Sequence, residues 1–326
     1  MKPPAETELL IGGQALIEGV LMRSPGAFGI AVRRPDGSLA LQRGKVSSIA
    51  KRWPALKLPI LRGVAVLFQS LFLGIQALNF SALEAATEVP ENTPESQGKK
   101  PDSSSASKWA VAGSMVMGLG LGVVIFLLVP LWLTELAQKY VFGDMPSLAF
   151  NLFDGLLRGI FFLVYILAIS RMDDIHRVFQ YHGAEHKVVF AWESGRGLTV
   201  ENARVQSRLH PRCGTSFLLF VLLVSIVLFA LIPKTAPFLV KFGGRLVLVP
   251  LIAGISYEVL RLTAKRSSSP VFRVLVAPGL ALQRITTQEP TDDMLEVAIV
   301  ALQEALREDG LMPEAIATAE EAPALA

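Results

Sequence analysis

A long run without charge is the feature that most constrains what this chain can fold into. Trp109 to Thr134 contains no Asp, Glu, Lys or Arg. Because a helix rises about 1.5 Å per residue, about 20 apolar residues cross the hydrocarbon core of a bilayer. The whole chain is 52% hydrophobic and 18% charged, whereas soluble proteins carry roughly 25% charge. The sequence therefore predicts a protein embedded in a lipid bilayer.

Further apolar runs predict three more spans, at about 148–170, 214–233 and 245–264. Asp154 and Arg158 lie four apart in the first of these runs, where they can pair on one helix face. We therefore expect a mainly α, polytopic membrane bundle of four transmembrane helices within residues 109–266.

The N-terminal region, residues 1–87, predicts a small β element and one ambiguous helix. Pro35-Asp36-Gly37 provides turn chemistry between two strand-like runs, at 28–34 and 38–43, which indicates a β-hairpin. The apolar segment 56–83 is broken by proline and glycine. It is read as an interfacial amphipathic helix, a re-entrant segment or a full span.

The remaining segments have more polar compositions. Residues 88–108 are rich in Pro, Ser, Glu and Lys and are predicted to form a disordered linker. Residues 267–310 combine spaced arginines with a helical apolar stripe after Thr291, which predicts a cytoplasmic amphipathic region. The Ala/Glu/Pro tail, 311–326, is predicted to be disordered.

The distribution of Lys and Arg predicts the orientation. Thirteen precede the first span, only Lys139 separates the first two spans, and seven lie in the loop at 171–213. Positively charged loops stay in the cytoplasm, so both termini and this loop are predicted to be cytoplasmic. We interpret the net charge of +3 by the distribution of Lys and Arg across the membrane and not as a sign of nucleic-acid binding, for which the sequence has no motif. A polar start at 1–10 predicts no signal peptide, and a single cysteine fits a reducing compartment.

All four histidines and the only cysteine fall within 38 consecutive residues. Imidazole and thiolate are common ligands of zinc and similar metals, so the cluster is a candidate metal site. His182, Glu185 and His186 match H-x-x-E-H, in which two histidines grip the ion and the glutamate takes a proton from water. The third ligand would come from one of His210, Cys213 and Glu258.

A structural site is the alternative for the same residues. His182 and His186 form one pair, and His210 and Cys213 form a second pair. Four protein ligands would close a zinc tetrahedron and leave no position for water. The histidines could instead only make hydrogen bonds in a packed polar loop. His176 is read as a membrane-interface residue.

Glu18 and Arg23 lie in and just after a stretch flanked by glycines. They are candidates for a ligand, an acid or an anion clamp at the site. The alternative is a tight turn and a surface ion pair. The glycines do not match a phosphate-binding loop.

Three motifs, GGQALIEGVLMRSP, YHGAEHKVV and HPRCGTSF, resemble the bacterial membrane proteins grouped as domain of unknown function 1385. The resemblance implies a predicted metal-dependent enzyme of unknown reaction in the bacterial cytoplasmic membrane. It also leaves open a role in protein synthesis or membrane insertion. The residues that it implicates are Glu18, Arg23, His182, Glu185, His186, His210, Arg212 and Cys213.

The sequence therefore predicts two alternative functions. The first is a zinc-dependent hydrolase that acts on a peptide or lipid-linked substrate, with Glu185 as general base. The second is a non-enzymatic scaffold for membrane biogenesis, stapled by zinc and docked to a ribosome or translocon. A transporter is a third option that would require an oligomer, and the sequence leaves the oligomeric state open.

Overall fold

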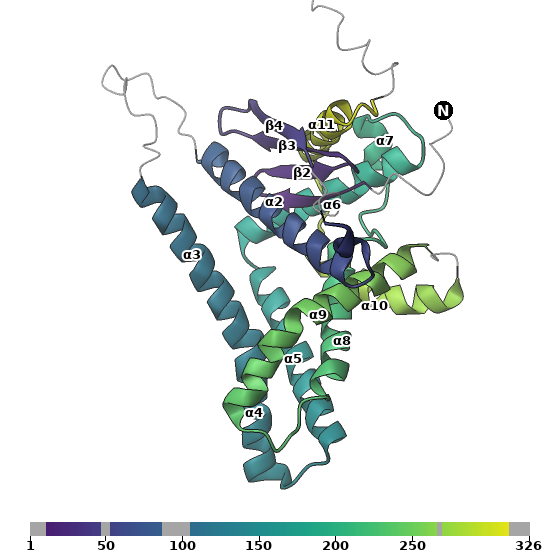
Figure 1. Cartoon of the computed structure of the whole chain (residues 1–326). Coiled ribbons are helices and arrows are strands. Elements are labelled where there is room, and N and C mark those ends of the chain that lie inside the picture. Colours follow the sequence, from purple (N-terminus) through teal and green to yellow (C-terminus); the bar gives the residue numbers. More distant parts are fainter. Residues whose placement is uncertain (1–10, 47–52, 87–104, 266–268, 313–326) are drawn as a thin grey trace, which may run out of the picture.

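The computed structural model describes residues 11–46, 53–86, 105–265 and 269–312. Helices dominate it, and a small antiparallel sheet lies at one end of a helical bundle (Figure 1). The predicted mainly α membrane fold with a small N-terminal β region is confirmed. Most of the predicted linker and tail, at 88–104 and 313–326, lies outside the described residues.

The sheet is a four-stranded meander in which neighbouring strands are antiparallel. Its strands are β1 (Gly12–Leu16), β2 (Gly19–Arg23), β3 (Ala27–Arg33) and β4 (Leu39–Lys45). The predicted hairpin corresponds to β3 and β4, and Gly37 in its turn has a φ of 83°. The first hairpin, β1–β2, turns tightly at Ile17 and Glu18.

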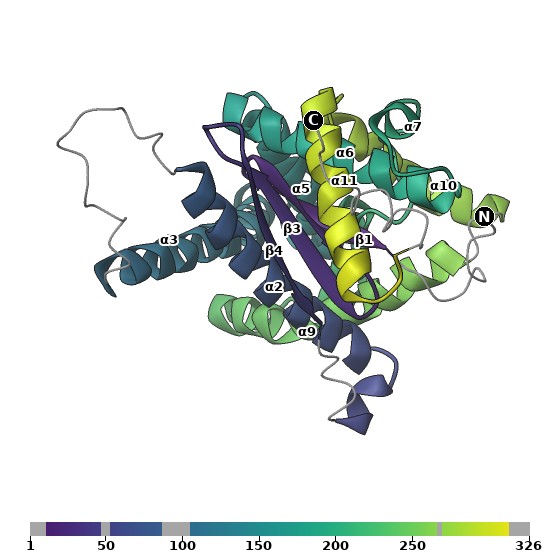
Figure 2. The same cartoon turned by 90° about the horizontal axis from the view of Figure 1, so that it is seen from above.

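Both faces of the sheet are covered by helices. Side chains alternate between the two faces along each strand, so each strand contributes to two separate cores. Val20, Met22 and Ala31 join one core with α6 (Asp173–Glu193), α7 (Val200–Arg204) and α11 (Asp292–Glu308). Leu21 and Ile30 join a second core with α2 (Leu61–Ala85) on the other face. Figure 2 shows α11 running along the sheet between β3 and α6.

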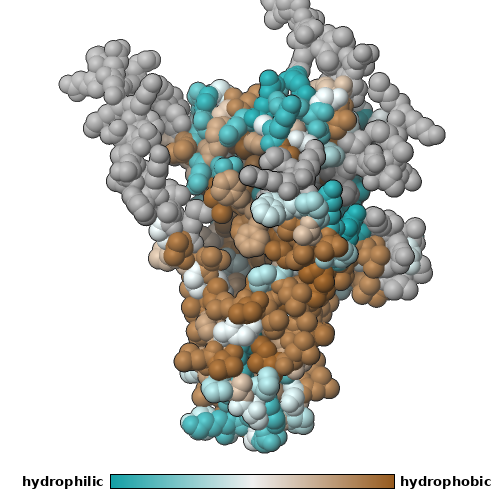
Figure 3. Space-filling view, in the orientation of Figure 1, coloured by the Kyte–Doolittle hydropathy of each residue, from teal (hydrophilic) through white to brown (hydrophobic). Residues whose placement is uncertain are grey.

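Four helices in the described part of the chain are long and apolar enough to cross a membrane. Three correspond to predicted spans: Val116–Phe142, Ser147–Ile169 (α5) and Phe238–Thr263. The first combines α3 (Ser105–Val123) and α4 (Val129–Ala137) with the π-helical turns that follow each of them, and the last belongs to α9 (Phe238–Lys265). On the face that Figure 3 shows, apolar side chains cover the bundle between two more hydrophilic ends.

The fourth spanning candidate is α2, while the predicted span at 214–233 forms the shorter helix α8 (Gly214–Phe229). One side of α2 packs on the sheet through Leu73 and Ala77. Phe68 and Phe72 are 59% and 65% exposed. The exposed aromatic rings on the side of α2 opposite the sheet suit contact with lipid, and the interfacial, re-entrant and spanning alternatives for 56–83 all stay predictions.

A close crossing joins α2 to α9. A Cβ on Gly254 would lie 2.7 Å from the carbonyl oxygen of Ile60, and one on Gly63 would lie 2.9 Å from the carbonyl oxygen of Gly254. Next to this crossing, Arg62 donates from Nε to Glu258 at 2.6 Å and from a terminal nitrogen to the second carboxylate oxygen. These contacts hold the sheet and the helices packed on its two faces, together called the sheet unit, against the apolar bundle.

The crossing generates a stability prediction. Gly254→Ala should destabilise the protein by about 1–3 kcal/mol, because its methyl group would push against the backbone of Ile60. Gly243→Ala on the same helix is the matched control, since a Cβ there meets no atom of the described residues within 4 Å. Thermal unfolding in detergent measures both. Equal melting temperatures for the two variants would contradict the crossing.

Candidate metal centre

Helix α6 presents the two candidate histidines side by side. His182 and His186 are four residues apart, so they share a helix face, and their ring centroids lie 4.5 Å apart. Between them, Gly183 packs directly on the backbone of Gln288, where a Cβ would collide with the carbonyl oxygen. The N–H of Gln288 in turn donates to the carbonyl of Phe179 at 2.8 Å. The absence of a side chain at Gly183 thus lets the segment after α10 (Pro270–Thr286) lie against α6.

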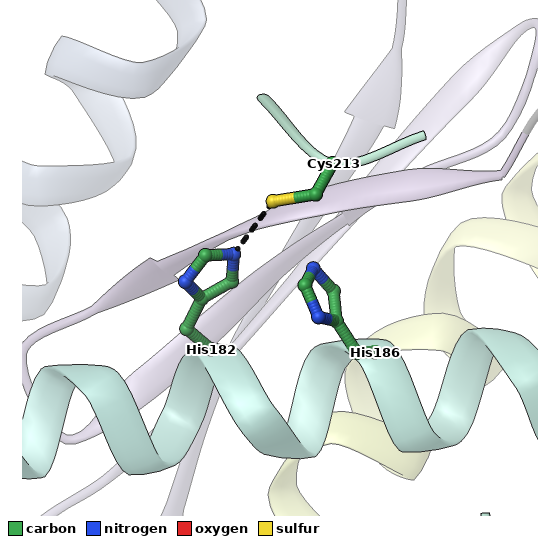
Figure 4. Close-up of side chains that lie close together, drawn as sticks. All are labelled: His182, His186 and Cys213. Atoms are coloured by element: carbon green, nitrogen blue, oxygen red, sulfur yellow. Dashed lines mark hydrogen bonds between the residues drawn. The ribbon is translucent and has the colours of Figure 1, made fainter. Parts of the chain in front are cut away.

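Cys213 reaches the same point from the loop before α8. It is the N-cap residue of α8, and its Sγ lies 3.1 Å from Nε2 of His182. One ligand atom from each of His182, His186 and Cys213 lies within 4.8 Å of the other two. Figure 4 shows both rings projecting from α6 toward the sulfur. The structure thus brings three of the predicted ligands together.

Backbone carbonyls orient both rings. Nδ1 of His182 lies 2.8 Å from the carbonyl oxygen of Thr286, and Nδ1 of His186 lies 2.5 Å from that of Arg208. A carbonyl oxygen only accepts, so Nδ1 of each ring is the donor, and in the neutral imidazole Nε2 then keeps its lone pair. Metal-binding histidines are commonly fixed in this way through the nitrogen that does not bind the ion.

The electrostatics of His186 also suit a metal ligand. Its burial lowers the pKa of the imidazole, and a hydrogen bond with Cys213 opposes this shift. A lowered pKa keeps the ring neutral at neutral pH, which is the form that binds a cation. His186 is therefore ready to act as a ligand without first losing a proton.

His210 lies beside the three-residue cluster and is held differently. Its ring centroid is 5.7 Å from that of His186. Its Nδ1 accepts the backbone N–H of Arg212 at 3.3 Å, and its Nε2 lies 3.5 Å from Glu193. Gln283 bonds both the N–H and the carbonyl of His210, at 2.8 and 2.9 Å. The ring is thus braced next to the cluster, and burial lowers its pKa to about 4.

Glu185, the predicted base, is buried between α6 and β1. A Cβ on Gly13 would lie 3.1 Å from its Cδ, so the absent side chain of Gly13 makes room for the carboxyl group. Burial raises the pKa of Glu185, while the nearby His182 opposes the shift. A carboxyl group with a raised pKa binds a proton more readily near neutral pH than an exposed one does.

The other predicted site residues lie outside the cluster. Glu258 is held by Arg62 through both oxygens, so the structure does not bring it to the histidines as a ligand. Glu18 accepts from Arg177 at 2.6 and 2.5 Å and from Tyr181 at 3.4 Å, which ties the β1–β2 turn to α6. The turn and surface-pair alternative for Glu18 matches this placement.

Arg23 points to α2, away from the histidines. Its terminal nitrogen donates to Oγ of Ser70 at 3.1 Å, and burial lowers its pKa. His176 is exposed near the start of α6.

The sequence did not reveal that Thr286, Arg208 and Gln283 hold the histidines in place. The first two act through backbone carbonyls, which no side-chain pattern reveals.

A family model described as "Protein of unknown function (DUF1385)" matches residues 58–308. The chain belongs to this family. A Bacillus subtilis (strain 168) protein named "Uncharacterized protein YqhQ" is 37% identical over 309 residues, which covers 95% of this chain and 94% of that protein. No solved structure matches the chain. The resemblance inferred from the three motifs is therefore confirmed, while its expectation of metal-dependent chemistry stays a prediction.

The geometry predicts a metal-content experiment. Purified protein should bind about one zinc ion per chain, and His186→Ala or Cys213→Ala should each lower the bound zinc roughly tenfold or more. His176→Ala is the matched control, since this histidine is exposed at the far end of the same helix. Elemental analysis after dialysis against a zinc buffer gives the readout. Retention of full zinc content by both ligand variants would exclude the site.

Proposed function

We propose that this membrane protein is a zinc-dependent hydrolase whose ion is held by His182, His186 and Cys213. The observation that carries the proposal is the convergence of the three ligand atoms within 4.8 Å. It is supported by the carbonyl contacts that leave both Nε2 atoms available. Imidazole nitrogen and thiolate sulfur are both established zinc ligands.

The number of ligands supports a catalytic site. Zinc in structural sites has four protein ligands, whereas catalytic zinc has three and an open position. His210 lies beside these three ligands; its Nδ1 accepts the backbone N–H of Arg212, and its buried Nε2, 3.5 Å from Glu193, has no hydrogen-bond partner among the described residues. A zinc ion with an open position would lower the pKa of a bound water toward neutrality.

Glu185 is proposed to act as the general base. It lies three residues after His182, so the two side chains are neighbours on α6. Its burial, which raises the pKa of the carboxyl group, prepares it to take a proton and to pass it to a leaving group. Gly13 leaves space at this carboxyl group, because any side chain there would press against it.

The position of the cluster points to a substrate at the membrane surface. Cys213 immediately precedes α8, which packs among α5, α9 and α10. The scissile bond would therefore lie near the end of the apolar bundle that adjoins the sheet (Figure 1). A peptide or a lipid-linked substrate anchored in the bilayer fits this place. By the distribution of Lys and Arg, this end faces the cytoplasm.

One observation favours a structural site as the second candidate function. The cluster joins three elements: α6 through its histidines, the start of α8 through Cys213, and the end of α10 through the carbonyl of Thr286. A metal there would staple the sheet unit to the bundle. In that case the protein would serve as a membrane-biogenesis scaffold that docks a ribosome or translocon.

Cobalt substitution distinguishes the two functions. Cobalt(II) replaces zinc and makes the coordination visible in the absorption spectrum. Acetohydroxamate should shift the cobalt bands if the fourth position is open, and it should leave them unchanged if four protein ligands close the site. An unchanged spectrum at saturating acetohydroxamate would reject the hydrolase and favour the scaffold.

A base variant tests the chemistry. Glu185→Gln should keep about one zinc per chain and lose about 10²- to 10⁴-fold of the turnover, because it cannot accept a proton. Turnover is measured in nanodiscs with mixed quenched fluorogenic peptides and fluorogenic lipid-linked esters. Glu201→Gln, which alters an exposed carboxylate on α7, is the control. Hydrolysis that survives in Glu185→Gln would refute the assignment of the base.

A further inference from the structure

A group of charged side chains lies inside the apolar bundle, away from the histidines. Asp154 on α5 is 1% exposed, Arg158 on the same helix is 6% exposed, and Arg245 on α9 is 2% exposed. Asp154 and Arg245 each lie seven residues after the start of their helix. At 1.5 Å per residue, this places them about 10 Å from the end of the bundle that is remote from the sheet. Ionisable groups at such depth are costly and commonly mark functional sites.

The carboxylate is shared between both arginines. Asp154 accepts from Arg158 at 2.5 Å through one oxygen and from Arg245 at 2.7 Å through the other. Arg158 also donates to Oγ of Ser225 at 2.7 Å. Both guanidinium groups lie over the ring of Phe229, at 4.6 and 5.0 Å from its centroid. The two cations are therefore fixed in place by α5 and α8.

The group has more positive than negative charge. Two guanidinium groups face one carboxylate, which leaves one uncompensated positive charge among these buried residues. The Nε atoms of both Arg158 and Arg245 are buried and have no hydrogen-bond partner in the described part of the chain. Leaving buried donors unpaired and a buried charge uncompensated is costly. Both deficits would be removed by one additional anion.

An ion pair at the remote end of the bundle lies between a solvent-exposed cleft and the helical turn that carries Arg245. At the remote end of the bundle, an open cleft of about 340 Å³ is lined by Glu135, Gln138, Lys139, Gly143 and Asp144. Glu135 forms an ion pair with Lys241, which is buried on α9. Lys241 precedes Arg245 by one helical turn, so the two cations lie on the same face of α9. Lys241, which pairs with a residue of the cleft, therefore lies one helical turn from Arg245.

We propose that Arg158 and Arg245 form a buried binding site for one singly charged anion between α5, α8 and α9. The unpaired Nε–H groups donate to the anion, and its charge balances the second arginine. The same chemistry accommodates a small free anion, such as chloride, or the phosphate of an anionic lipid. The site is independent of the metal cluster and of the proposed hydrolysis.

The test uses the full-length protein in nanodiscs and measures thermal unfolding. In one arm, the bilayer is phosphatidylcholine and chloride replaces gluconate at constant ionic strength. In the other arm, chloride is absent and phosphatidylglycerol is added to the bilayer. A ligand that binds only the folded state raises the melting temperature, by about 5 °C or more at a hundredfold excess over its Kd. A rise in the first arm identifies a free anion, and a rise in the second arm alone identifies the lipid phosphate.

Two variants should shift the anion response in opposite directions. Arg245→Gln removes the surplus charge and should abolish the rise. Asp154→Asn increases the surplus to two positive charges and should lower the anion concentration needed for half of the rise. Arg171→Gln alters an exposed arginine just after α5 and should respond like the unchanged protein. Chloride-35 NMR line broadening on the unchanged protein provides a second measurement in case the variants do not fold.

A purely structural ion pair network gives a different pattern. Both Arg245→Gln and Asp154→Asn would then lower the melting temperature, and neither would change its dependence on anions. That pattern overturns the proposal. So does the absence of any response in both arms of the unchanged protein, together with unbroadened chloride resonances.

Discussion

The burial of α6 on two sides is the constraint on which the arrangement of this protein depends. One side carries Tyr181, Ala184 and Val188 into the core that α6 shares with the sheet and α11. The other side presents His182 and His186 to the loop before α8 and to the end of α10. Because one helix serves both units, the sheet unit and the apolar bundle meet at the histidines. The candidate metal centre is therefore at the junction of the two units.

Much of this organisation can be predicted from the sequence, because the decisive signals are local. An uncharged run of spanning length predicts a membrane helix, and the spacing of His182 and His186 predicts a shared helix face. Cys213 could be expected at the site because it is the only cysteine and lies close to the histidines in the chain. The hairpin of β3 and β4 was visible from its turn residues. All of these depend on residues that lie close together in the chain.

The remaining features depend on contacts between distant segments. The apolar composition of α2 does not reveal that one of its sides packs on a sheet and that Arg62 pairs with Glu258. The hairpin of β1 and β2 was not assigned as strands, since glycine is depleted in strands and both begin with it. Glu258 was a candidate ligand because of its distance along the chain, which carries no information on its partner. The surplus charge beside Asp154 required the position of Arg245 on another helix.

The close fit at Gly183 limits how this protein can vary during evolution. Since any side chain at this position would meet the backbone of Gln288, substitutions there are selected against by packing, whether or not the histidines bind an ion. An invariant glycine at this position among relatives would therefore be no argument for catalysis. The informative positions would be those whose side chains are free of such steric limits, where only chemistry can restrict the choice of residue.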